Sequence, residues 1–173
     1  MLYGPRDVRY EDRPDPKIIE PTDAIIKLSA ACVCGSDLWP YRGIDLVKQP
    51  VPMGHEYVGI VEEIGSAVKN IKPGQFVVGS FATSDNTCPN CRSGYQSSCV
   101  QREFMSGAQA PLLRVPLADG TLVATPGIPS DDLIWSRKIN PGKVFDLTLP
   151  LEQVAEGYRA MDERRAIKAL LRP

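Results

Sequence analysis

Residues 57–64 read YVGIVEEI, and they decide the class of fold that this sequence predicts. The stretch is short, rich in β-branched side chains and followed by glycine, which is typical of buried or half-buried strands. Residues 24–30 (AIIKLSA) and 75–79 (QFVVG) have the same character. Because these strands do not alternate with helices, the sequence predicts a mainly β fold, a partly open barrel with few helices, rather than an α/β sheet.

A β-hairpin is predicted in the middle of the chain. Residues 112–115 and 121–125 are short apolar runs, and an Asp-Gly pair lies between them at 119–120. An Asp-Gly pair between two such runs favours a tight turn that joins antiparallel strands.

Helices are expected at two places. Residues 35–42 (GSDLWPYR) predict a short helix that Ser36 or Asp37 caps. Residues 150–165 carry apolar side chains at helical intervals and charged side chains on the other face, which predicts one amphipathic helix. Residues 166–171 (AIKALL) predict a final strand, although this composition would also extend the helix.

The chain divides into three parts. Residues 1–127 contain the predicted barrel, and a cysteine-rich lobe spans 84–100 within it. Residues 128–142 hold two prolines and show no clear period, so they are interpreted as a joint. Residues 143–173 form a C-terminal segment that is expected to pack back onto the first part.

Composition excludes several classes of protein. The 173 residues carry 20 basic and 21 acidic side chains, so the formal charge of −1 argues against a nucleic-acid partner. A hydrophobic fraction of 43% excludes the disordered class. No apolar run approaches the ~20 residues of a membrane helix, and nine charged side chains among the first twenty residues exclude a secretory signal. We therefore expect a cytoplasmic protein without a membrane partner.

Four residues of the lobe have the spacing of a structural zinc site. Cys88 and Cys91 are separated by two residues, Cys99 follows, and Asp85 repeats the spacing one step upstream. Zinc in a closed site takes four ligands in a tetrahedron, and thiolates on a two-residue spacer can share one metal. The alternative is a loop whose reduced cysteines bind nothing. In the cytoplasm a disulfide framework is the less favoured use of five cysteines.

A second candidate metal site is dispersed along the sequence. Cys34 follows one predicted strand, and His55 and Glu56 precede the next. A thiolate, an imidazole and a carboxylate near one point suffice for a zinc ion with an open position, which is the catalytic arrangement. Spacing alone does not bring them together. The alternatives are an ordinary surface or core histidine and a cysteine buried as a small apolar residue.

Taken together, these residues resemble the catalytic, GroES-like domain of the medium-chain zinc-dependent alcohol dehydrogenases. The matching stretches are residues 34–37, 54–59, 61–65, 72–77 and 88–99. The resemblance implies that Cys34 and His55 hold a catalytic zinc and that Glu56 can enter its coordination. It also implies that Ser36 passes the proton of the alcohol toward solvent and that Asp37 hydrogen-bonds the ligand histidine. The implied reaction interconverts a small alcohol and its aldehyde by hydride transfer to NAD(P).

The nucleotide-binding part that the resemblance requires is not evident. The fourteen glycines contain no pair at the Gly-x-Gly spacing of a dinucleotide cradle. We therefore expect that this doubly wound, Rossmann domain is missing between residues 127 and 138, together with the remaining ligand of the catalytic zinc. Removal of a packed domain would expose apolar side chains, Trp135 among the candidates, unless they were redesigned or covered by self-association.

Three functions remain open at this point. The first is an oxidoreductase of the zinc alcohol dehydrogenase type, which in this truncated form is not competent as a dehydrogenase. The second is an engineered or natural zinc-binding scaffold without redox function. The third is a subunit that receives the nucleotide domain from another chain.

Overall fold

The computed structural model describes residues 1–127 and 144–173. The predicted joint and Trp135 lie outside the described residues. The three-part division of the chain therefore stays a prediction.

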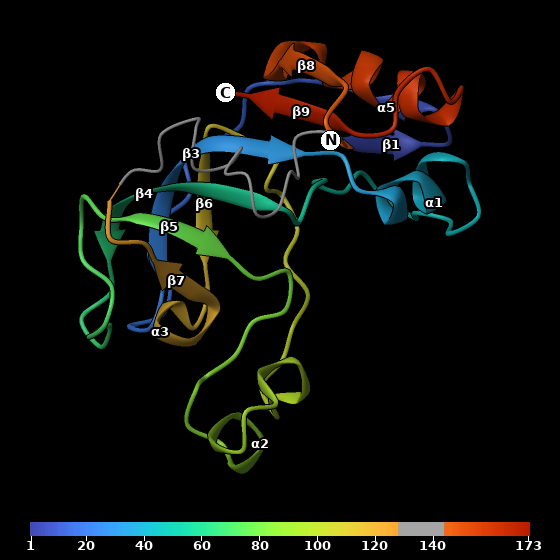
Figure 1. Ribbon diagram of the computed structural model, residues 1–173. Coiled ribbons are helices and arrows are strands. Elements are labelled where there is room, and N and C mark those ends of the chain that lie inside the picture. The colour runs from blue at the N-terminus through green and yellow to red at the C-terminus, as the bar shows by residue number, and fades with distance from the viewer. Residues whose placement is uncertain (128–143) are drawn as a thin grey trace.

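A seven-stranded sheet organises the molecule (Figure 1). Its strands are β3 (Ala24–Cys32), β4 (Tyr57–Ile64), β5 (Phe76–Gly79), β6 (Leu112–Val115), β7 (Leu122–Ala124), β8 (Leu147–Pro150) and β9 (Ala169–Arg172). They follow the order β7-β5-β4-β3-β9-β8, and β6 also pairs with β3. All neighbours are antiparallel except β8 and β9, which are parallel. The mainly β, partly open architecture is confirmed, and no doubly wound domain occurs within 1–127 or 144–173.

Short elements connect the strands. They are β1 (Leu2–Gly4), β2 (Asp7–Val8), the 3-10 turns η1 (Gly35–Asp37), η2 (Gln96–Ser98) and η4 (Leu151–Gln153), and the helices α1 (Leu38–Tyr41), α2 (Pro89–Arg92), α3 (Ala118–Thr121) and α5 (Val154–Asp162). The short helix expected over 35–42 is confirmed as η1 followed by α1. None of the described helices has the length and apolar character that crossing a membrane requires.

Strand β3 leads from one hydrophobic core of the molecule to the other. One edge of β3 pairs with β4, and the other pairs with β6 near its start and with β9 near its end. Ile26 of β3 lies in a core with residues of β4 to β7, whereas Val33, directly after β3, lies in a second core with α5 and β9. The end of β3, which leads to Cys34, is therefore fixed by the C-terminal segment.

The C-terminal segment forms a helix and a strand, as predicted. Val154, Tyr158 and Met161 are buried and place the apolar face of α5 on the second core. The helix ends at Asp162, and Arg164, two residues later, has a left-handed φ of 59°. Residues 169–172 then join the sheet between β3 and β8. Of the two structures predicted for 166–171, a final strand and an extension of the helix, the strand is confirmed.

The hairpin expected around Asp119-Gly120 is wrong. Strand β6 pairs with β3 and β7 pairs with β5, so the two strands do not pair with each other. The Asp-Gly pair lies inside α3, where the Asp119 carboxylate accepts hydrogen bonds from the backbone N–H groups of Lys69 and Asn70 at 2.8 Å. Glycine is required at 120 by close approach, because a Cβ there would lie 2.1 Å from the Ser84 carbonyl oxygen.

Candidate metal and active sites

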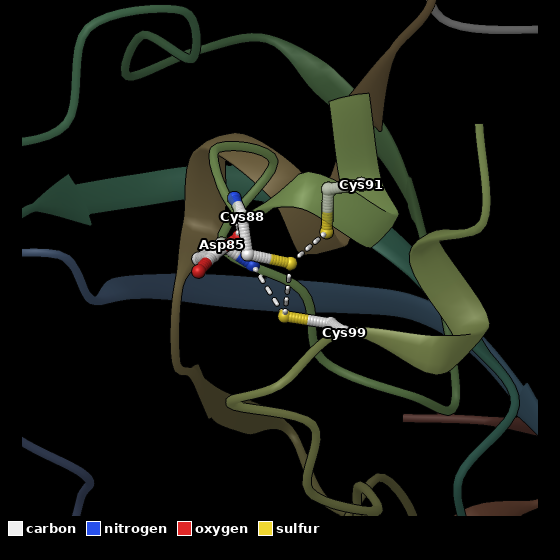
Figure 2. Close-up of side chains that lie close together, drawn as sticks. All are labelled: Asp85, Cys88, Cys91 and Cys99. Atoms are coloured by element: carbon white, nitrogen blue, oxygen red, sulfur yellow. Dashed lines mark hydrogen bonds between the residues drawn. The ribbon is translucent and has the colours of Figure 1, made fainter. Parts of the chain in front are cut away.

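Three sulfur atoms of the lobe point toward one another (Figure 2). Cys88 precedes α2, Cys91 lies on that single turn, and Cys99 follows η2. The Cys88 Sγ lies 3.5 Å from that of Cys91 and 4.0 Å from that of Cys99. A tetrahedral zinc with Zn–S bonds of ~2.3 Å separates its sulfurs by about 3.8 Å. The lobe therefore fits a zinc ion.

Asp85 completes the group. Its ligand atom and the three sulfurs all lie within 4.8 Å of one another, and no other such group of three or more occurs in the part of the chain that the structure describes. The Asp85 Oδ1 accepts hydrogen bonds from the backbone N–H groups of Cys88 at 3.0 Å and Thr87 at 2.8 Å. These bonds lower the pKa of the Asp85 carboxyl to about 2. A carboxylate that is ionised at neutral pH suits a metal ligand.

The root of the lobe is anchored to α3. The Ser84 hydroxyl donates to the Gly120 carbonyl at 2.7 Å, and the Ser84 N–H donates to the Thr121 hydroxyl at 3.2 Å. Since Ser84 directly precedes Asp85, the turn at α3 fixes the start of the metal-ligand segment. Figure 1 shows the rest of the lobe, around α2, projecting away from the sheet.

Cys34 and His55 meet at Ser36. The Ser36 hydroxyl lies 3.3 Å from the Cys34 Sγ and 3.4 Å from the His55 Nε2. Asp37 accepts the backbone N–H of Cys34 at 2.9 Å through one oxygen and lies 3.2 Å from the His55 Nδ1 through the other. The N-cap of η1 is Cys34. Of the two expected caps, Asp37 stands at the N-cap of α1 but makes no side-chain bond to that helix, and it acts instead from the third position of η1. Formation of η1 thus places Ser36 and Asp37 where they contact both Cys34 and His55.

The contacts in this network raise the pKa of His55 and lower that of Cys34. The hydrogen bond with Asp37 raises the pKa of His55 to about 9, against a smaller opposing effect of burial. Burial alone would raise the pKa of the Cys34 thiol, but hydrogen bonds with Ser36 and His55 outweigh it and lower that pKa. Since Asp37 holds Nδ1, the Nε2 of His55 is the nitrogen that faces Cys34 and Ser36.

Glu56 lies near this network but is engaged elsewhere. Its Oε2 accepts the Cys32 thiol at 2.7 Å and lies 2.6 Å from the Lys168 Nζ. Burial acts to raise the pKa of Glu56, and the bonds with Cys32 and Lys168 outweigh it, so the pKa is lowered and the carboxyl is ionised. The resemblance implies three ligands at one point. The structure brings Cys34 and His55 together and pairs Glu56 with Lys168.

An open pocket of about 430 Å³ contains these side chains. Its lining consists of Cys34, Ser36, His55, Glu56, Phe81, Phe104 and Met105. The ring of Phe81 presents an edge contact to His55 at 6.3 Å between centroids and stacks on Phe104 at 5.9 Å. Sequence reasoning missed this apolar wall and Lys168. An antiparallel bridge between Ala82 and Phe104 creates the wall, and no motif in the sequence marks that bridge.

Comparison with known proteins identifies the family. The sequence profile described as "Alcohol dehydrogenase GroES-like domain" matches residues 20–127, which is more than half of the chain. The chain therefore belongs to this family.

Several relatives and solved structures are similar to the chain. It is 41% identical to the medium chain reductase/dehydrogenase ucsI of an Acremonium species over 178 residues, covering 99% of this chain and 60% of that protein. It is 38% identical to the zinc-type alcohol dehydrogenase B of Aspergillus flavus, covering 84% of this chain and 35% of that protein. Zinc-dependent alcohol dehydrogenase 2 from Streptococcus pneumonia matches with 30% identity and a TM-score of 0.68, over 90% of this chain and 50% of that chain.

One further solved structure supports the fold alone. Alcohol dehydrogenase TADH from Thermus sp. ATN1 matches with a TM-score of 0.87 but 17% identity, over 99% of this chain and 98% of that chain. This chain spans 60% and 35% of the lengths of the two curated relatives named above.

Proposed function

We propose that this chain is the zinc-binding catalytic domain of an alcohol dehydrogenase-like oxidoreductase, which with a nucleotide-binding domain interconverts a small alcohol and its aldehyde using NAD(P). The proposal depends on one observation: Cys34, Ser36, His55 and Asp37 form a single network in an open pocket. Relatives that are named as zinc-type alcohol dehydrogenases support the class of reaction.

Cys34 and His55 are the residues that would hold a zinc ion in the pocket. When bound there, zinc supplies a Lewis acid that lowers the pKa of an alcohol oxygen. Asp37 holds a proton of His55 on Nδ1, so Nε2, which faces the pocket, is the nitrogen that would give up its proton and bind the metal. Glu56 is the third candidate ligand, and it must leave Lys168 before it can coordinate.

Ser36 is the residue that we assign to the proton of the alcohol. Its hydroxyl lies within hydrogen-bond distance of both Cys34 and His55, and its side chain is exposed, so a proton can pass from it to water. The apolar wall of Phe81 and Phe104 offers a surface for the carbon chain of a substrate. Hydride acceptance belongs to a nicotinamide. We expect no turnover by these 173 residues alone, because they contain no Gly-x-Gly cradle.

A zinc-binding scaffold without redox function is the second candidate. One observation favours it: the group of Asp85 and the three lobe cysteines is complete, whereas the Cys34 network brings two zinc donors together. The third candidate is a subunit that receives its nucleotide domain from another chain or that self-associates. Exposed apolar side chains support it, among them Trp39, which is 56% exposed.

A count of bound zinc separates these proposals. The catalytic-domain proposal expects two zinc ions per wild-type chain and one in each of the variants Cys34→Ser and Cys91→Ser. The scaffold proposal expects one in the wild type and none in Cys91→Ser, and a wild-type chain without zinc contradicts both. Titration with reduced nicotinamide cofactor should leave the fluorescence of protein and cofactor unchanged, and oxidation of the cofactor by the chain alone would contradict the need for a second domain.

We also propose a reducing compartment, the cytoplasm, as the location of the protein. All five cysteines are free. The three cysteines of the lobe can bind a metal together with Asp85 only while their thiols stay reduced.

A further inference from the structure

Gln109 links the two segments that carry Cys34 and His55. Its side-chain Nε2 donates to the Cys32 carbonyl at 3.4 Å, and its backbone N–H donates to the Met53 carbonyl at 3.1 Å. Cys32 lies two residues before Cys34, and Met53 lies two residues before His55. Gln109 thus bonds to the backbone of both segments, two residues before Cys34 and two residues before His55.

The packing at Gly54 makes this link close. Gly54 directly precedes His55 and has a φ of 93°, and a Cβ there would lie 2.6 Å from the Gln109 Cγ. The carbonyl of Gly54 also accepts the N–H of Ala108 at 3.0 Å. The backbone before His55 therefore rests directly on Gln109, without an intervening side chain.

Tyr158 of α5 fixes the orientation of the Gln109 amide. The Tyr158 side chain is fully buried, and its hydroxyl donates to the Gln109 Oε1 at 3.1 Å. Because a buried hydroxyl needs a partner, this bond keeps the Oε1 toward Tyr158 and the Nε2 toward the Cys32 carbonyl. The C-terminal helix is thereby connected to the residues that flank Cys34 and His55.

We infer that Gln109 is a positioning residue that holds the Cys34 and His55 segments in register, with Tyr158 orienting its amide. The inference rests on the proposed function in so far as the positioned residues bind a metal. It concerns neither the lobe nor the groups that contact a substrate. A glutamine that bonds both segments makes the two donors converge before a metal arrives. Groups that hydrogen-bond a metal ligand directly typically change metal affinity about 10- to 100-fold, and we expect the lower end of this range for Gln109, which acts through the backbone.

The test compares Gln109→Met, which has a similar length and no polar amide, with the control Gln75→Leu. The side chain of Gln75 also bonds a backbone group, the N–H of Lys72 at 2.8 Å, but this bond lies away from the Cys34 and His55 segments. Titration with Co²⁺ is followed by thiolate-to-cobalt absorption. The absorption that remains in Cys34→Ser comes from the lobe cysteines, which identifies the lobe step. We expect Gln109→Met to weaken the Cys34-dependent step about tenfold and to leave the lobe step unchanged. Equal affinities in wild type and Gln109→Met would overturn the inference.

A measurement on the metal-free chain keeps the inference separate from the proposed function. Hydrogen exchange at the backbone amide of Cys34 should accelerate at least tenfold in Gln109→Met, while exchange at Val77 in β5 stays at the wild-type rate. Tyr158→Phe, which removes only the hydroxyl, should give a smaller change in the same direction and serves if Gln109→Met does not fold. Unchanged exchange at Cys34 refutes the positioning role. If the wild type binds one Co²⁺ only, the proposed function fails and the exchange result still decides the role of Gln109.

Discussion

Asp37 is the residue on which the geometry of the pocket most depends. Its two carboxylate oxygens serve two purposes, since one closes the turn after Cys34 and the other pairs with His55. A single buried carboxylate therefore couples the local fold to the protonation of the imidazole. The sequence predicted a short helix at this place with Ser36 or Asp37 as its cap, and the resemblance to a known family supplied the bond between Asp37 and His55.

Replacement of Asp37 by asparagine should lower the pKa of His55. The pKa of His55 is about 9 in the folded, metal-free chain, above the ordinary value of 6.5, and the bond with Asp37 is the main cause. The resulting stability is fully present below pH 6.5 and is lost as pH rises through about 9. We expect Asp37→Asn to bring the pKa well below 9 and to flatten this pH dependence of the melting temperature.

The single histidine of the chain makes the measurement direct, because one imidazole resonance titrates in the NMR spectrum. The matched control is Asp7→Asn, an exposed aspartate that pairs with Arg9. A pKa for His55 that stays near 9 in Asp37→Asn would show that another group holds the proton.

At the scale of elements, strands were predictable and strand partners were not. β-Branched content and bounding glycines located β4, and the same signals located β3 and β5, because these depend on local composition. The pairing of β6 with β3 and of β7 with β5 depends on contacts between distant parts of the chain. The same limit applies to the Glu56–Lys168 pair, whose members are brought together when β9 joins β3.

The turn at α3 provides an element-scale test. A methyl group on Gly120 would lie 2.1 Å from the Ser84 carbonyl oxygen, so Gly120→Ala forces apart the turn and the root of the lobe. Insertion into a packed site typically costs about 1–3 kcal/mol, and we expect a loss of this size in the free energy of unfolding. Urea denaturation measures it.

Gly4→Ala is the control for this test, because a Cβ at Gly4 meets nothing within 4 Å. A change of no more than about 0.5 kcal/mol is expected there. If Gly120→Ala is as stable as Gly4→Ala, the lobe root does not rest on α3 as described.

At the scale of the whole molecule, the C-terminal segment is an integral part of the fold. Leu171 of β9 is fully buried in the second core, and truncation of such a leucine costs about 2–5 kcal/mol. Leu171→Ala should lower the free energy of unfolding by this amount. Ile167→Ala is the nearby control, since Ile167 is 67% exposed and should change stability by about 0.5 kcal/mol or less.

Strand β3 contributes to the first core, pairs with β9 and leads directly to Val33 of the second core, so we expect the two cores to unfold together. Urea curves of Leu171→Ala should show one transition at a lower midpoint. A separate early transition, with the rest of the sheet unchanged, would show that the C-terminal segment unfolds independently of the barrel.

The projecting lobe has a consequence for how the chain could be divided. Strands that precede the lobe (β5, β4, β3) form the centre of the sheet, and strands that follow it flank them, with β7 beside β5 and with β6 and β9 beside β3. Cleavage by trypsin after Arg92, within the lobe, would leave two fragments that each contribute side chains to every core of the molecule. The fragments should co-migrate until denaturant is added, which makes this lobe a natural place for split-protein reconstitution or for grafting another sequence.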